Sequence, residues 1–493
     1  MSISISQKAS AGKLGQTAIA RRQLLLLGGG IILIHFAFLK PAIWGLDGNE
    51  VLQVAHSLVT QHGFTVSPDV GGIEGIDGQR YSSRYLLLPI LLTPLMAIAV
   101  GLSQQIGLSP LQIAATFAVA SSVVFTAATA VMVVLLAHRL GSQPRAAYVA
   151  ALCYAFGTIA LTYAQTLFSE PLLGFLLVTT IFLAFGTTAK ARLSSSLMVT
   201  LAILAKPTAV VVAPILSLYF LAKRYSSFQT MGPVILPILG AIAYGFYNFK
   251  RFGDPLDTGQ PTHYALTAVG MWERFFGFFF SAGMGGGLVW YCPPVILALI
   301  GLYKLFKAKP IEAIAIALIC VAFSGLHAFW WCCGWDWGPR FLVPLLPLMM
   351  SLSALLDYRA RQWLIGLSIL GFVINAPTLV SFYQRYYWEI DTAGRDVWSL
   401  SLWTPLANAP IFNVWGAAYR QVSEAISTDV SAVVATGELS GLTQIVPVWW
   451  WMLPAVGLPV WPGAVLAGGS AMAGIKLLHR GLLYCSENVP AQD

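Results

Sequence analysis

The chain has 493 residues, of which 57% are hydrophobic and only 10% are charged. Soluble domains carry roughly 25% charged residues, and one soluble core cannot bury this much apolar surface. The sequence therefore predicts an all-α polytopic membrane protein. The formal net charge of +8 is typical of Lys and Arg in cytoplasmic loops, which excludes nucleic acid as a partner.

Apolar runs that are long enough to be membrane segments divide the chain. The basic connections between them, such as 188–194 and 304–309, are predicted to be cytoplasmic. Run 86–102 contains Pro89 and Pro94 and is predicted to be half-inserted, which leaves about twelve crossings. The thirteen runs fall at 23–43, 86–102, 112–138, 146–163, 170–187, 195–205, 208–222, 230–248, 287–305, 311–328, 341–357, 363–381 and 446–475.

The connections predict how the chain is organised. The long ones fall on the outer face and the cytoplasmic ones are short, so the function is expected on the outer face. The predicted parts are a cytoplasmic tail (1–22), a transmembrane catalytic module (23–381, with a first outer loop at 44–85), an extracytoplasmic segment (382–445), and a final transmembrane helix with a cytoplasmic tail (446–493).

Two carboxylates open the first outer loop, in the stretch "LDGNEVLQVAHSLVTQHG" (46–63). The apolar spacing after them predicts an amphipathic helix on the outer membrane surface, ending at Gly63. Asp47 or Glu50 in its first turn would suit a general base. The alternative is that Asp47 or Asn49 caps the helix and that Glu50 favours the helix dipole.

Three further stretches place charge at membrane boundaries. Tyr81 and Arg84 precede an apolar run, where Arg84 would hold a lipid-linked phosphate or anchor the interface. Glu170 stands before Pro171. It is either a functional carboxylate at the membrane boundary or a solvated residue at the start of a helix. Lys206 joins two apolar stretches too short to cross the membrane. It would bind phosphate in a cavity or extend to the membrane surface.

The stretch "CGWDWGPRFLVPLLPLM" (333–349) sets Trp335 and Trp337 around Asp336, with Arg340 following. Aromatic walls beside a carboxylate suit a carbohydrate, because sugar faces stack on indole rings while hydroxyl groups bond to carboxylates. Arg340 would hold a phosphate. The alternative is a belt of aromatic side chains at the membrane surface.

The order of these stretches resembles the GT-C superfamily of membrane glycosyltransferases, which includes protein O-mannosyltransferases and the aminoarabinose transferases that modify lipid A. The resemblance covers most of 20–385. It also rests on "GIDGQRYSSRY" (75–85), "TLFSEPLLGF" (166–175), "LAKPTAVVVAP" (204–214) and "YNFKRFGDPLDTG" (247–259).

The resemblance implies a GT-C-like bundle with amphipathic helices in the first outer loop. It implies inverting transfer of a hexosyl or pentosyl group from a polyprenyl-phosphate donor to a glycan, lipid or protein acceptor. The family's base falls on Asp47, with Glu50 as the alternative. Arg84, Tyr81, Glu170, Lys206, Trp335, Asp336, Trp337 and Arg340 would bind substrate.

The same resemblance predicts a multi-pass protein in contact with membrane lipid, in a bacterial inner (plasma) membrane, with its active site outward. A divalent metal ion as cofactor is left open, because metal use varies in the superfamily and no metal-binding cluster stands out in the sequence. The alternative function is a polytopic transporter or lipid flippase. Such a protein would be expected to show two similar halves.

Overall fold

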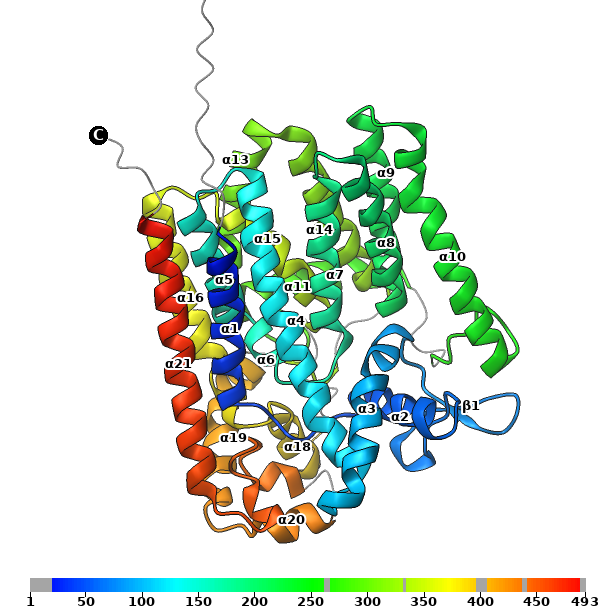
Figure 1. The fold of residues 1–493 in the computed structure, drawn as a ribbon, viewed down its shortest axis with the longest axis vertical. Helices are drawn as coiled ribbons and strands as arrows, with labels where there is room; N and C mark the ends of the chain where they lie inside the picture. Colours follow the sequence, from blue (N-terminus) through cyan, green and yellow to red (C-terminus); the bar gives the residue numbers. More distant parts are fainter. Residues whose placement is uncertain (1–19, 261–266, 331–333, 396–405, 437–440, 488–493) are drawn as a thin grey trace, which may run out of the picture.

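The computed structural model describes residues 20–260, 267–330, 334–395, 406–436 and 441–487. A bundle of helices runs roughly along the vertical axis of Figure 1. They are α1 (Arg21–Ala37), α4 (Pro110–Leu140), α5 (Pro144–Gly157), α7 (Ser169–Ala184), α8 (Ala189–Ala205), α9 (Val212–Ala222), α10 (Ser227–Phe252), α13 (Ala298–Ala308), α14 (Pro310–Trp330), α15 (Leu346–Ser353), α16 (Tyr358–Asn375) and α21 (Val460–Glu487).

Further elements lie between these helices along the chain. The helical ones are α2 (Leu46–Thr60), α3 (Leu87–Ile106), α6 (Ala160–Tyr163), α11 (Met271–Phe280), α12 (Leu288–Tyr291), α17 (Pro377–Val380), α18 (Gln384–Thr392), α19 (Pro410–Ala425) and α20 (Val430–Thr436), with 3-10 turns η1 (Pro68–Val70), η2 (Pro207–Val211), η4 (Pro293–Leu297), η5 (Arg340–Leu345), η7 (Leu406–Asn408), η8 (Gly441–Gln444) and η9 (Leu453–Val456). Strands β1 (Ile73–Glu74) and β2 (Arg80–Tyr81) pair antiparallel, with Ile73 opposite Tyr81.

In the described part of the chain, five helices are long and apolar enough to cross a membrane: 87–105, 110–140, 227–252, 310–329 and 358–380. Shorter apolar helices lie at 169–184, 207–222 and 340–353. These helices agree with the prediction of a multi-pass membrane protein. The count of twelve crossings and the half-insertion of 86–102 stay predictions. The segment 86–102 forms most of α3, which lies beside the lower part of α4 in Figure 1.

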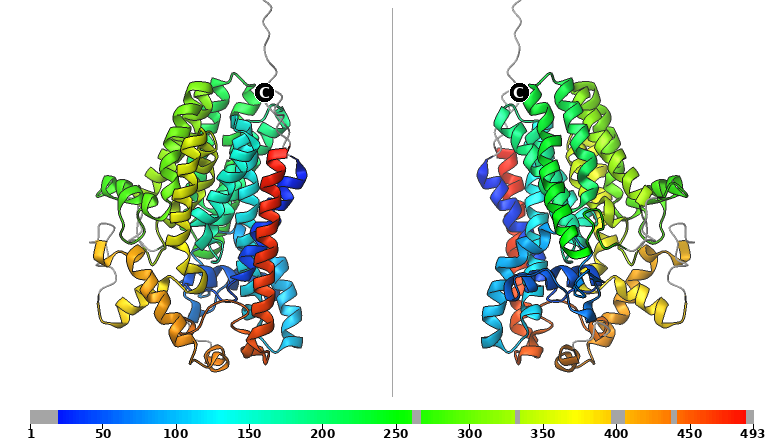
Figure 2. Two further views of the ribbon diagram at one scale, coloured as in Figure 1. Left: turned by 90° about the vertical axis from the view of Figure 1, so that its left-hand side faces the viewer. Right: turned by 90° about the vertical axis from the view of Figure 1, so that its right-hand side faces the viewer.

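The elements formed by the predicted outer loops gather at one end of the bundle. Figures 1 and 2 show α2, α18, α19 and α20 at the end opposite the last turn of α21. Segment 382–445 forms α18, α19 and α20 there, and its residues 396–405 and 437–440, like most of the predicted N-terminal tail, lie outside the described residues. Helix α2 covers the predicted amphipathic stretch but ends at Thr60, three residues before Gly63.

Close packing joins the first and last helices of the bundle. A Cβ atom on Gly474 would lie 2.7 Å from the carbonyl oxygen of Gly30, and one on Gly30 would lie 2.6 Å from Leu478. Small residues at such contacts let two helix backbones approach closely, which is the usual basis of helix association in membranes.

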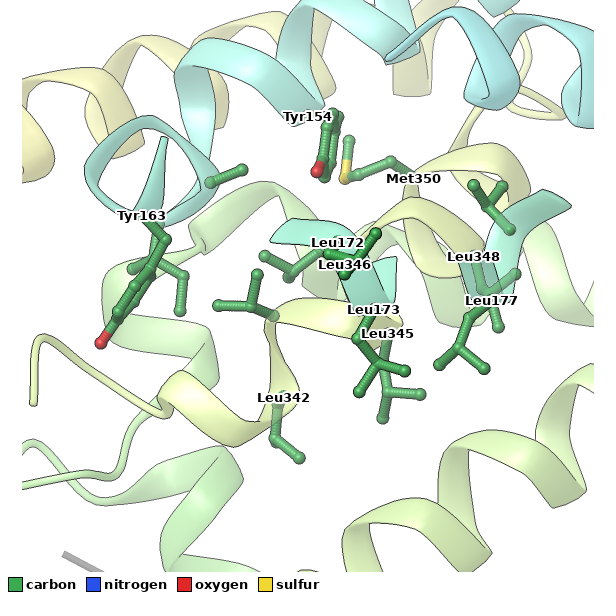
Figure 3. Packing of buried hydrophobic residues seen from close by; sticks show 14 of the residues in the cluster. Tyr154, Tyr163, Leu172, Leu173, Leu177, Leu342, Leu345, Leu346, Leu348 and Met350 are labelled. Atoms are coloured by element: carbon green, nitrogen blue, oxygen red, sulfur yellow. The ribbon is translucent and has the colours of Figure 1, made fainter. Parts of the chain in front are cut away.

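The helices that carry the candidate site share a packed apolar core. Figure 3 shows leucines of α7 facing leucines of η5 and α15, with Tyr154 and Tyr163 beside them. Because closely packed side chains resist displacement, this core fixes the first turns of α7 and η5. These two turns carry Glu170 and Arg340.

Candidate functional site

A cavity of about 470 Å³ lies where α2, the start of α7, the break between α8 and η2, and the start of η5 meet. Its polar lining contains three cationic side chains and three carboxylates. The residues that line it are Trp44, Gly45, Leu46, Asp47, Val51, Arg84, Tyr85, Leu88, Leu167, Phe168, Ser169, Glu170, Ala205, Lys206, Gln260, Gly334, Trp335, Asp336, Arg340, Phe341 and Gln384.

Asp47 lies in the first turn of α2, two residues after Gly45, whose φ of 112° favours glycine. Its carboxylate is 2.8 Å from Arg84 Nη2 and 3.2 Å from Arg340 Nη1. The helix N-cap is Gly45 and has no side-chain cap, while Asn49 donates to the carbonyl oxygens of Ile43 and Gly45. Asp47 is therefore an ion-pair partner in the cavity, and the capping alternative does not describe it.

Glu50 is buried and lies outside the cavity lining. Its Oε2 atom accepts a 2.6 Å hydrogen bond from Ser82 Oγ and lies 3.7 Å from Arg84 Nε. The hairpin loop covers its other side, because a Cβ atom on Gly71 would be 3.5 Å from Glu50 Oε1. Glu50 thus holds the loop that carries Arg84 and does not face the open space.

Arg340, at the start of η5, contacts all three carboxylates of the cavity. Its Nη1 atom reaches Asp47, while Nε lies 3.2 Å from Asp336 Oδ1 and 3.7 Å from Glu170 Oε1. The guanidinium carbon lies 4.4 Å from the ring centroid of Phe168. A planar guanidinium carries several N–H donors and stacks on aromatic rings, which suits it to this shared position.

Lys206 stands where the helix breaks, as the short apolar runs predict. It has an extended conformation after α8, and Pro207 begins η2. Its ammonium is 2.7 Å from Glu170 Oε1 and 4.2 Å from the ring centroid of Phe341. Both side chains of the pair are buried, so Lys206 does not extend to the surface and Glu170 is not a solvated helix start.

The Trp-Asp-Trp stretch divides between cavity and core. Trp335 and Asp336 line the cavity, and Trp335 stacks on Tyr387 at 5.9 Å. Trp337 is fully buried, and its indole N–H donates to Asn375 Oδ1 at 2.6 Å. Trp337, which was predicted to bind substrate, does not line the cavity, and its ring packs edge-on against Tyr291 in the core.

Tyr81 does not line the cavity either. It lies on β2, where its hydroxyl donates to Asp77 Oδ2 at 2.7 Å and its ring packs edge-on against Phe252. The hairpin directs the Tyr81 side chain toward Phe252 of α10, so its role in substrate binding stays a prediction that this cavity does not support. In contrast Phe168 and Phe341, which sequence reasoning did not select, support the cavity cations. The available signal was their position in the sequence: Phe341 directly follows Arg340, and Phe168 lies two residues before Glu170.

The carboxylates of the cavity differ in proton affinity. Burial tends to raise the pKa of Asp47, but the guanidinium groups of Arg84 and Arg340 outweigh it, so that its pKa is lowered overall. Burial raises the pKa of Asp336 to about 6, with Arg340 opposing. Because its pKa is lowered, Asp47 is ionised at neutral pH, and in this arrangement its arginine partners make it a weak base.

The residues do not fit a metal ion as they are arranged. In the part of the chain that the structure describes, no group of three or more His, Cys, Asp and Glu side chains could hold one. The guanidinium of Arg340 occupies the position between Asp47, Glu170 and Asp336 that a cation would need.

No protein-family model matches the sequence, and no curated protein matches it. Among solved structures, ArnT from Cupriavidus metallidurans, bound to undecaprenyl phosphate, aligns with a TM-score of 0.47 and 14% identity, over 94% of this chain and 78% of that chain. The Archaeoglobus fulgidus oligosaccharyltransferase in the apo form aligns with a TM-score of 0.47 and 13% identity, over 78% of this chain and 60% of that chain.

Both neighbours are GT-C glycosyltransferases, the superfamily that the sequence motifs resemble. Their TM-scores lie below 0.5 and their identities below 15%. These likenesses therefore carry no argument about the site.

Proposed function

We propose that the protein is a membrane glycosyltransferase that moves a hexosyl or pentosyl group from a polyprenyl-phosphate donor to an acceptor on the outer face. One observation carries the proposal: Asp47 shares one cavity with Arg84, Lys206 and Arg340. A carboxylate beside three cations is what the transfer of a sugar from a phosphate leaving group requires.

In the proposed reaction, an acceptor hydroxyl or amine attacks the anomeric carbon of the donor sugar. A bond forms between that carbon and the acceptor atom, while the bond from the carbon to the phosphate oxygen breaks. Asp47 takes the acceptor proton, and the polyprenyl phosphate leaves with the electron pair of the broken bond. Attack from the side opposite the phosphate inverts the anomeric centre.

Charge develops on the phosphate oxygens as that bond breaks. Arg84, Arg340 and Lys206 would stabilise it, since cationic donors placed before the reaction cost little reorganisation. Both guanidinium groups can donate two N–H groups to one phosphate. Trp335 and Asp336 line the same cavity and would receive the sugar ring and its hydroxyl groups.

The test uses two separate variants, Asp47→Asn and Glu50→Gln, with a radiolabelled polyprenyl-phosphate sugar in vesicles. We expect Asp47→Asn to reduce transfer by about 10²–10⁴-fold, the usual loss when a general base is removed. Glu50→Gln should lose less, because Glu50 faces Ser82. The matched control is Glu74→Gln, an exposed carboxylate in the same loop.

Full transfer by both variants would refute the assignment of the base. If the wild-type protein neither binds nor consumes the labelled donor, the transferase proposal itself fails. A transporter or lipid flippase would instead move the labelled lipid between leaflets without releasing its sugar, and the same vesicles distinguish the two outcomes.

A positioning residue follows from the contacts of the Arg84 loop. Arg251, at the end of α10, is buried and donates to the carbonyl oxygen of Ser82 and to Asn248 Oδ1. Its guanidinium lies 3.7 Å from the ring centroid of Tyr247. Because Ser82 lies two residues before Arg84, Arg251 sets where Arg84 points.

We therefore expect Arg251→Gln to raise the KM for the donor about tenfold while kcat changes less, since a misplaced cation weakens phosphate binding. Lys250→Gln, on the exposed side of the same helix turn, is the control and should leave both constants unchanged. Steady-state kinetics on purified protein provides the measurement. A fall in kcat at unchanged KM would indicate loss of folded protein and would contradict a positioning role.

A further inference from the structure

Every cationic side chain of the cavity already has a carboxylate partner. Arg84 pairs with Asp47 at 2.8 Å, and Lys206 pairs with Glu170 at 2.7 Å. Arg340 contacts Asp47 and Asp336 at 3.2 Å each. An anionic phosphate that enters the cavity therefore competes for N–H groups that are in use.

The carboxylates are not equally easy to displace. The Asp47 side chain is 30% exposed, whereas those of Glu170 and Asp336 are 2% and 6% exposed. A buried carboxylate that loses its counterion has a large desolvation penalty, but a half-exposed one can be solvated by water. Asp47 is the partner that can leave its arginines at the lowest free-energy cost.

We propose that donor binding is a counterion exchange in which the lipid phosphate displaces Asp47 from Arg84 and Arg340, so that Asp47 becomes an available base only after the donor is bound. This inference rests on the proposed function and adds an order to it: donor first, acceptor second. Lys206 and Glu170 stay paired through the exchange, as the buried part of the site.

The exchange also explains how Asp47 can act as a base although two arginines hold it in an ion pair. While paired, the Asp47 carboxylate is a poor proton acceptor because two positive charges favour its ionised form. Once the phosphate neutralises those charges, the proton affinity of Asp47 rises. The base is thus activated only when a donor is present.

The test measures how tightly sugar-free polyprenyl phosphate binds to the purified protein in detergent, by isothermal titration calorimetry. We expect Asp47→Asn to bind the phosphate lipid about tenfold more tightly than the wild type, because the competing charge is gone and both arginines remain. Asp47→Ser should behave in the same way, and Glu74→Gln should match the wild type. Thermal denaturation confirms that each variant is folded.

Equal or weaker binding by folded Asp47→Asn and Asp47→Ser would overturn the exchange, even if the wild type binds the lipid and transfers sugar. If the wild type does not bind polyprenyl phosphate at all, the proposed function fails and the exchange fails with it. Initial-rate kinetics adds an independent check: a mechanism in which the acceptor binds productively before the donor would contradict the order inferred here.

Discussion

Replacing Arg340 by Gln is expected to destabilise the folded protein by about 3–5 kcal/mol and to abolish sugar transfer. The reason is that removing one member of a buried ion network leaves the others without compensation. Here the side chain lost is the one that contacts Asp47, Glu170 and Asp336 together. In the variant, Lys206 would still pair with Glu170, but it would not replace the contacts of Arg340 with Asp47 and Asp336.

The measurement is the free energy of unfolding in detergent, or the thermal midpoint, alongside transfer activity. Arg420→Gln is the matched control, because Arg420 is half-exposed and pairs with Glu389 on the outer segment. Exposed ion pairs contribute about 0–1 kcal/mol, so the control should be nearly neutral. An Arg340→Gln protein as stable as the control would show that the carboxylates do not depend on this guanidinium.

The parts of the site that local pattern determines could be predicted from the sequence. The break at Lys206 follows from two apolar runs too short to cross a membrane, separated by a Lys-Pro pair. The pairing of Asp47 with Arg84 and Arg340 does not follow from any local pattern in the sequence. The distance between residues 47 and 340 is set by how the bundle packs, and one sequence does not reveal that.

Asp47 and Glu50 show where the sequence is insufficient. They lie three residues apart on α2, so a helical pattern places both on nearly the same side. What separates them is the loop that returns from the β hairpin, whose Ser82 bonds to Glu50 across 32 positions. Trp337 is a similar case, since its indole direction depends on Asn375 of α16.

The Lys206–Glu170 pair allows folding and function to be measured separately. Lys206→Met alone should destabilise the protein by about 3–5 kcal/mol, because it leaves Glu170 charged and buried without its partner. The double variant Lys206→Met with Glu170→Leu should recover most of that loss, since an apolar pair of similar volume is often neutral or stabilising in place of a buried ion pair.

Transfer activity should not recover with stability. If the positive charge of Lys206 helps to hold the lipid phosphate, the double variant will be folded but at least about tenfold less active, because the ammonium beside Phe341 is then lost. Thermal denaturation and labelled-donor transfer on the same preparations provide both readouts. Full activity in a stable double variant would assign the pair to folding alone and leave phosphate binding to Arg84 and Arg340, whose counterion would still be Asp47.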